Sequence, residues 1–142
     1  ESVIKLSLFL LSKNYFLVFF GSTKFEYKMM LEVEKAVSSS GIYNLVCKTK
    51  IDELPSYLKQ IKLLVTNDTG ILHLAIAMKI KTLSLFGPTS SKEFGAYQDQ
   101  NLHHSIQKNG FFVNDKPKKS RTQDGMKLIS VDEVIFKLEE MI

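Results

Sequence analysis

The stretch Leu63-Leu-Val-Thr-Asn-Asp-Thr-Gly-Ile-Leu-His73 decides the fold, because an apolar run passes through a small polar turn into a second apolar run. Residues 63–65 are continuously apolar, which is typical of a strand buried on both faces of a sheet. Residues 71–78 suit a helix, in which Ala75 and Ala77 are small enough to allow close packing on that sheet. The sequence therefore predicts a strand, a polar turn and a helix in immediate succession.

The same alternation extends on both sides of this stretch without a hairpin signal. We expect strands at residues 15–20, 43–47, 63–65 and 82–86, and helices at residues 3–11, 26–38, 51–61 and 71–78. Ser130 and Glu133 form a capping-box pattern that predicts a final amphipathic helix, whereas residues 101–125 look like loop apart from a short strand at 111–113. Strands that alternate with helices predict an α/β fold, a parallel sheet covered by helices on both faces. Its 142 residues suit a single domain, 1–142.

Composition and charge narrow the class of protein. Hydrophobic residues make up 44% of the chain and charged residues 24%, which is ordinary for a globular protein and argues against disorder. The net charge of +4 favours approach to phosphorylated small molecules or anionic surfaces. The densest basic run, Lys116 to Arg121, has no interleaved aromatic residues, so nucleic acid is not the expected partner.

Cysteine, histidine and the apolar first segment bear on compartment and metals. Cys47 is the single cysteine and lies in an apolar run, so we expect a buried side chain in a reducing, cytoplasmic compartment. The three histidines lack paired ligand spacing, so no metal site is expected. Lys5 and Lys13 interrupt the apolar residues 3–20, which are therefore not expected to span a membrane. The chain begins with Glu1 and shows no signal peptide, which suggests a fragment.

The polar turn after residue 65 carries the main chemical expectation. In a parallel α/β sheet it lies at the carboxyl end of a strand, where ligands bind. The amides of Thr69 and Gly70, together with the helix dipole, would form a site for a phosphate. Asp68 would repel a phosphate, so it either accepts hydrogen bonds from sugar hydroxyls or caps the helix, and the turn alone does not separate these alternatives.

Two further groups of residues accompany this turn. His73 lies about one helical turn further on, where it would reach an anion held at the helix start, unless it is a satisfied core residue. The next strand ends in Phe86-Gly-Pro-Thr89, which places Gly87 and Thr89 at the same sheet edge, although such a turn is also common as plain structure.

Taken together, these residues resemble a known family. Residues 67–73, then Ala75 and Ala77, then Leu85-Phe-Gly-Pro-Thr89 are similar to the donor-site signature of the bacterial heptosyltransferases, the ninth sequence family of glycosyltransferases. Upstream, Phe19-Phe-Gly21 followed by Glu26 resembles the family's strand, glycine and ribose-binding glutamate. Met126 to Val134 resembles its closing Met-x-x-Ile segment before the last helix. The chain departs from the family pattern at Lys81, near the usual proline, and at Ser90, where an acidic residue is usual.

The resemblance implies a Rossmann-like, carboxyl-terminal half of a GT-B glycosyltransferase that binds ADP-heptose for transfer to the lipopolysaccharide inner core. It implies donor contacts by Asp68, Thr69, Gly70, His73, Glu26, Gly87 and Thr89, with no cofactor and no metal. The acceptor domain and its catalytic base would lie outside this chain, and the location would be cytoplasmic, at the inner-membrane face. A non-catalytic nucleotide-sugar-binding remnant and a GT-B epimerase or hydrolase remain the alternatives.

Overall fold

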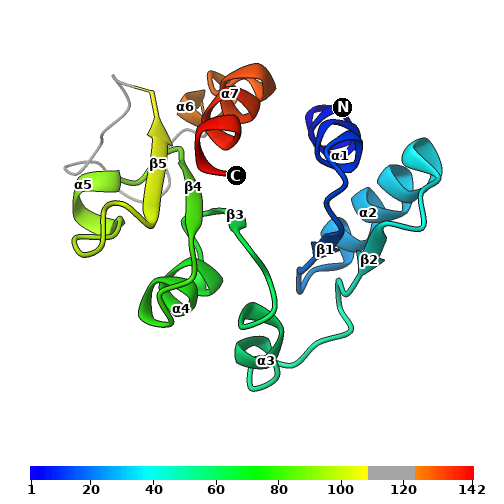
Figure 1. Ribbon diagram of the computed structural model, residues 1–142, viewed down its shortest axis with the longest axis horizontal. Helices are drawn as coiled ribbons and strands as arrows, with labels where there is room; N and C mark the ends of the chain where they lie inside the picture. The colour runs from blue at the N-terminus through cyan, green and yellow to red at the C-terminus, as the bar shows by residue number, and fades with distance from the viewer. Residues whose placement is uncertain (109–123) are drawn as a thin grey trace.

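Short parallel strands alternate with helices throughout the computed structural model, which describes residues 1–108 and 124–142 (Figure 1). The strands in the described part are β1 (Leu17–Phe19), β2 (Ile42–Asn44), β3 (Leu64–Asn67), β4 (Thr82–Phe86) and β5 (His103–Gln107). The helices in the same part are α1 (Ser2–Ser12), α2 (Lys24–Val37), α3 (Leu54–Leu58), α4 (Gly70–Ala77), α5 (Ser91–Phe94), α6 (Asp124–Lys127) and α7 (Val131–Met141). The predicted α/β alternation is therefore confirmed.

The strands form two hydrogen-bonded groups, and every pairing within them is parallel. β1 pairs with β2, while β3, β4 and β5 form a three-stranded sheet with β4 in the middle. In the second group Asn67 lies opposite Leu85, and Phe86 lies opposite Gln107. The carboxyl ends of β3, β4 and β5 consequently meet at one edge of the sheet.

Helices cover both faces of the three-stranded sheet. On one face, Leu83 and Ile106 pack with Val134, Leu138 and Met141 of α7, together with apolar residues of α1. On the other face, Leu64 packs with Leu58 of α3 and Ala75 of α4. Figure 1 shows α4 and α7 on opposite sides of this sheet. This arrangement explains the continuous apolar run of β3, since its neighbouring residues enter two different hydrophobic clusters.

The β1–β2 pair has a hydrophobic cluster of its own. Met30 and Val33 of α2 are buried against Val46, and Ile4 of α1 and Phe19 of β1 pack around them. α1 contacts both α2 and α7, so it lies between the two sheets' covering helices (Figure 1).

The strand β5 was not predicted, since residues 101–125 were expected to be loop. Its side chains are mostly polar, and only Ile106 is buried among them. Pairing with β4 supports the strand, because the buried Thr82 Oγ1 lies 2.9 Å from His103 Nδ1 and Ser84 donates to the carbonyl of His104 at 3.1 Å. The polar sequence of β5 did not predict a strand, because its polar groups form hydrogen bonds with the neighbouring strand β4. The strand expected at residues 111–113 lies outside the described residues.

Two further expectations concern the last helix and the single cysteine. Ser130 caps α7 by accepting from the Glu133 amide, as predicted, while the Glu133 carboxylate pairs with Lys108 Nζ at 2.7 Å. The expectation that Cys47 is buried is wrong: its side chain is exposed and its φ of 59° places it in a left-handed turn after β2. Val46 occupies the core position instead.

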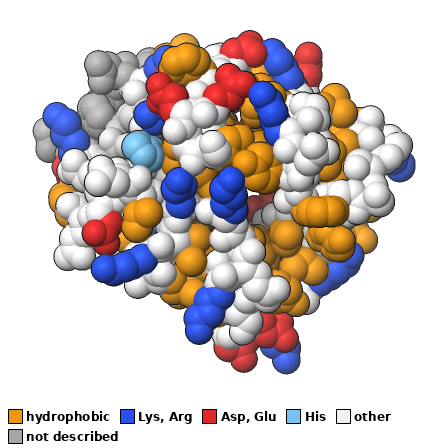
Figure 2. Space-filling view, viewed as in Figure 1, with side chains coloured by type: hydrophobic (Ala, Val, Ile, Leu, Met, Phe, Trp, Pro, Cys, Tyr) orange, Lys and Arg blue, Asp and Glu red, His pale blue; other side chains and the backbone are white. Residues whose placement is uncertain are grey.

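The distribution of surface charge and the lengths of the helices bear on binding to nucleic acid and to membranes. Figure 2 shows Lys and Arg side chains scattered among hydrophobic and acidic ones, without a continuous basic stripe on the described part of that face. No helix in residues 1–108 or 124–142 is long and apolar enough to cross a membrane.

Candidate functional site

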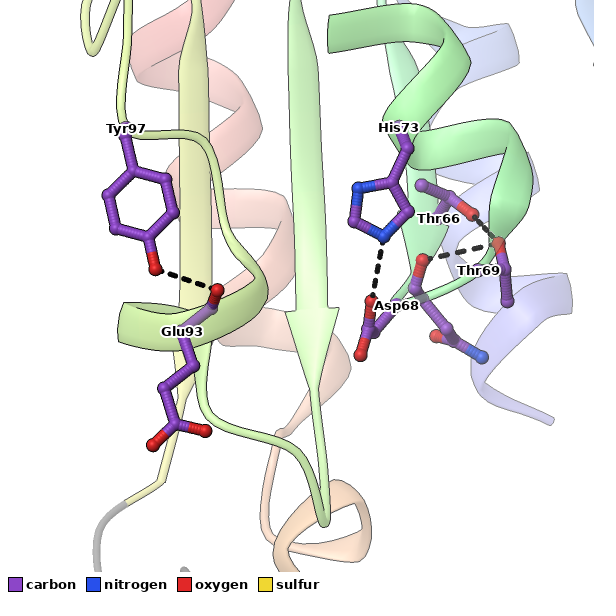
Figure 3. A network of polar contacts seen from close by, with 7 residues as sticks. Thr66, Asp68, Thr69, His73, Glu93 and Tyr97 are labelled. Atoms are coloured by element: carbon purple, nitrogen blue, oxygen red, sulfur yellow. Dashed lines mark hydrogen bonds and ion pairs between the residues drawn. The ribbon is translucent and has the colours of Figure 1, made fainter.

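The site expected from the sequence lies at the carboxyl edge of the β3–β4–β5 sheet. The β3–α4 turn (residues 68–69) follows β3 directly, and the β4–α5 loop (residues 87–90) follows β4 directly. Because β3 and β4 pair in parallel with Asn67 opposite Leu85, the turn and the loop emerge side by side. Figure 3 shows them on either side of the end of β4. The predicted placement of both segments at one edge is confirmed.

The helix α4 begins at Gly70, one residue later than an Asp68 cap would require. Thr69 is the N-cap residue, with extended φ and ψ of −145° and 170°, and its side chain makes no capping bond. The Thr69 hydroxyl instead lies 3.3 Å from Thr66 Oγ1 and 3.4 Å from the Asn67 carbonyl oxygen. The capping alternative for Asp68 is therefore wrong, and within residues 1–108 and 124–142 no side chain caps the first turn of α4.

An open space lies over the start of α4. A Cβ added at Gly70 would meet no heavy atom within 4 Å. The first amides of a helix lack intrahelical partners, and the helix dipole places partial positive charge there. This combination of uncapped amides and free space can accept an anionic group close to the backbone.

Asp68 and His73 face each other across the first turn of α4. Asp68 Oδ1 lies 3.5 Å from His73 Nε2, and Figure 3 shows the imidazole pointing back toward the carboxylate. The His73 side chain is 53% exposed and that of Asp68 is 17% exposed. The alternative that His73 is a core residue is therefore wrong. The pair offers a carboxylate acceptor and a ring nitrogen beside the uncapped amides.

Neighbouring elements hold the β4–α5 loop from two sides. A Cβ at Gly87 would lie 3.2 Å from the Met126 Cβ, so the absence of a side chain lets α6 pack against the loop. The Gln107 side chain, at the end of β5, donates to the Thr89 carbonyl at 2.6 Å and accepts from the Ser91 amide at 2.8 Å. Sequence reasoning missed Gln107, because it lies in a polar stretch whose strand was not recognised.

Glu26 lies in the first turn of α2, the helix that follows strand β1 of the other sheet. It forms a capping box with Thr23 at the start of α2, and its Oε2 accepts from the amides of Ser22 and Thr23 at 3.0 and 2.9 Å. The same oxygen accepts from the Thr23 hydroxyl at 2.8 Å. Hydrogen bonds from the Thr23 hydroxyl and amide hold the pKa of the Glu26 carboxyl below its ordinary value. A Cβ at Gly21 would lie 3.1 Å from this oxygen, so the glycine makes room for the capping box.

Of the residues expected in the site, Asp68, Thr69, Gly70 and His73 lie within one turn and its helix. Gly87 and Thr89 lie in the adjacent loop, and Glu26 follows β1 in the other sheet. Within residues 1–108 and 124–142, no three histidine, cysteine, aspartate or glutamate side chains are grouped so as to hold a metal ion. The positive field at this edge comes from backbone amides and from the dipole of α4.

Comparison with solved structures places this arrangement among known folds. The glycosyltransferase family 9 protein of Veillonella parvula superposes with a TM-score of 0.79 at 22% identity, over 99% of this chain and 40% of that one. The ADP-heptose lipopolysaccharide heptosyltransferase II of Escherichia coli superposes with a TM-score of 0.76, also at 22% identity, over 99% of this chain and 40% of that one. Both likenesses support a Rossmann-like α/β fold.

Sequence comparison identifies relatives and a family. Lipooligosaccharide heptosyltransferase 2 of Campylobacter jejuni is 33% identical over 92 residues, which are 63% of this chain and 29% of that protein. Lipopolysaccharide heptosyltransferase 2 of Escherichia coli K12 is 31% identical over 84 residues, 57% of this chain and 24% of that protein. The chain thus spans a minor part of the length of these relatives. The model of glycosyltransferase family 9 (heptosyltransferase) matches residues 4–123, most of the chain, and the protein belongs to this family.

Proposed function

We propose that this chain is the donor-binding domain of a heptosyltransferase and holds an ADP-sugar, ADP-heptose, with its diphosphate at the start of α4. The observation that carries the proposal is the uncapped first turn of α4 beneath open space at Gly70, next to the Asp68–His73 pair. Family membership and the names of the relatives support a transferase that acts on lipopolysaccharide.

Each side chain of the site has a task that its chemistry suits. The amides of Thr69 and Gly70 bind the diphosphate, and His73 donates to a phosphate oxygen or to the sugar next to it. Asp68 accepts hydrogen bonds from sugar hydroxyls, which a carboxylate does more strongly than a neutral acceptor. Gly87 and Thr89 border the same space from the β4–α5 loop.

Glu26 is proposed to contact the ribose. Its Oε2 is already engaged in the capping box of α2, so a ribose hydroxyl would bind through Oε1. The lowered pKa of this carboxyl keeps it ionised, and therefore an acceptor, at neutral pH.

The reaction we propose is an inverting transfer by the whole enzyme. An acceptor hydroxyl of the lipopolysaccharide inner core attacks the anomeric carbon of the heptose, the bond to the diphosphate breaks, and ADP leaves. The negative charge that develops on the diphosphate is stabilised by amides that already point at it, so the contribution of this domain is electrostatic. The base that takes the hydroxyl proton, and the surface that holds the acceptor, belong to a second, amino-terminal domain. We place the enzyme in the cytoplasm, at the inner-membrane face where its acceptor would lie.

Calorimetric titration of the chain with ADP and with ADP-heptose tests the proposal. We expect weak binding of both, and no transfer to a heptose-deficient lipopolysaccharide acceptor, because we assign the base and the acceptor surface to the amino-terminal domain. Transfer by the chain together with a separately added amino-terminal domain would distinguish a transferase from a non-catalytic remnant. Release of free heptose by the chain alone would instead indicate a hydrolase, and absence of ADP and ADP-heptose binding would refute the proposal.

A further inference from the structure

The Gln107 side chain joins the end of β5 to the β4–α5 loop through both ends of its amide. Nε2 donates to the Thr89 carbonyl at 2.6 Å, and Oε1 accepts from the Ser91 amide at 2.8 Å. Gln107 lies opposite Phe86, the last residue of β4, so it reaches the loop at the point where the strand ends. A neutral amide suits this pair of bonds, because it carries a donor for the Thr89 carbonyl and an acceptor for the Ser91 amide.

This contact replaces a local cap on α5. Ser90 is the N-cap residue of that helix and is buried, yet its side chain makes no capping hydrogen bond. The Ser91 amide belongs to the first turn, where amides have no intrahelical partner. Gln107 therefore supplies from another strand the acceptor that a local N-cap side chain usually supplies.

The opposite end of the loop packs against α6. The Met126 Cβ of α6 lies 3.2 Å from where a Cβ of Gly87 would be. Residues 87–91 are thus attached to α6 at their beginning and to β5 at their end. A loop that is held at both ends before a ligand arrives loses less conformational entropy on binding.

We propose that Gln107 is a positioning residue for the donor: it fixes the β4–α5 loop in the conformation that borders the diphosphate-sugar at the start of α4. The inference rests on the proposed function, because it assumes that the donor lies between this loop and the β3–α4 turn. Gln107 itself does not touch the donor. Its effect is transmitted through the backbone of Thr89 and Ser91.

Two substitutions separate the two hydrogen bonds. Gln107→Leu removes both, and we expect ADP-heptose to bind the chain roughly fivefold or more weakly, since each lost bond contributes modestly. In Gln107→Glu the ionised carboxylate still accepts from the Ser91 amide but repels the Thr89 carbonyl, whereas the protonated carboxyl can donate to it. Its affinity relative to that of the wild type should therefore rise as the pH is lowered toward about 4.3, the ordinary pKa of a glutamate carboxyl, while that of Gln107→Leu should not.

Two control variants isolate this effect from general destabilisation. Ile106→Val weakens the core at the neighbouring position of β5. Gln60→Leu removes a similar bond just after α3, from Gln60 Nε2 to the Ser56 carbonyl at 3.0 Å. Both controls should bind ADP-heptose like the wild type. Hydrogen exchange of the Ser91 amide, measured without ligand, should accelerate in Gln107→Leu and stay unchanged in the controls.

The outcomes distinguish this inference from the proposed function. If the wild-type chain binds ADP-heptose and Gln107→Leu binds it with the same affinity, the positioning role is overturned but the proposed function is not. Slow Ser91 exchange in Gln107→Leu would overturn it too, because the loop would then be held without this side chain. Failure of the wild-type chain to bind either ADP or ADP-heptose would refute the proposed function, and the positioning role would fall with it.

Discussion

Replacing Asp68 by Asn tests whether this carboxylate serves the helix or the donor. Thr69, not Asp68, is the N-cap residue of α4, so the substitution removes no cap. The folded protein loses the contact of Asp68 Oδ1 with His73 Nε2, at 3.5 Å, with the histidine half exposed. A contact of this kind contributes less than about 1 kcal/mol, so the free energy of unfolding should change little.

The effect on the donor should be larger and should depend on the sugar. A hydrogen bond to a charged group contributes about 1.5–3 kcal/mol, which corresponds to roughly tenfold to a hundredfold in affinity. ADP-heptose should therefore bind Asp68→Asn at least tenfold more weakly than the wild type. ADP lacks the heptose that Asp68 is proposed to bind. Its affinity for the Asp68→Asn variant should therefore stay constant or rise, because a negative charge has left the vicinity of the phosphates.

Calorimetry with both ligands, together with urea unfolding, measures these quantities on one preparation. Asp132→Asn is a matched control, since it makes the same charge change on α7, where Asp132 Oδ1 pairs with Lys5 Nζ at 2.6 Å. The control should leave both affinities unchanged. If a stable Asp68→Asn variant binds ADP-heptose as the wild type does, Asp68 does not bind the sugar and the reasoning is refuted.

The other predictions concern the helix start and two titrating groups. Gly70→Ala should leave stability unchanged or raise it by up to about 1 kcal/mol, since its Cβ enters open space, yet weaken ADP binding; equal ADP affinity would place the diphosphate elsewhere. The pKa of Glu26 is lowered chiefly by Thr23, so the unfolded chain takes up this proton first as pH falls below about 4.3. Glu26→Gln should flatten that acid-side loss of stability in urea unfolding, and it should weaken ADP binding only if Glu26 contacts the ribose. Burial lowers the pKa of His103, so the unfolded chain binds its proton at a higher pH than the folded one. Stability should therefore be full above about pH 6.5 and fall as pH drops toward the folded pKa, and His103→Gln should reduce this slope; an unchanged slope would assign it to other groups.

Much of the fold could be predicted because the signals are local. The apolar run at residues 63–65 and the capping pattern of Ser130 and Glu133 each act within a few residues. The same reliance on local signals explains the wrong prediction for Cys47. Its apolar neighbours in the sequence indicate burial, but they do not reveal the left-handed turn that exposes its side chain. β5 was missed because its polar side chains are stabilised by Thr82 and Ser84 of another strand.

In the candidate site, too, some features could be recognised from the sequence and others could not. The polar turn at residues 68–69, the glycine that follows it and the second loop at residues 87–90 were recognisable by order and spacing, as was the edge at which they meet. The sequence did not reveal that Thr69 is the N-cap residue of α4, that His73 approaches Asp68, or that Gln107 holds the loop.

The sequence by itself determined the alternation of strands and helices, the parallel pairing and the edge of the sheet that carries the polar residues. Hydrophobic periodicity and turn chemistry involve residues that are close in the sequence, so both can be recognised from the sequence alone. Only the tertiary structure decided which polar groups partner one another, since Gln107 and Thr89 lie 18 positions apart and meet through the pairing of β4 with β5. Such contacts depend on distances in space that residue spacing along the chain does not contain.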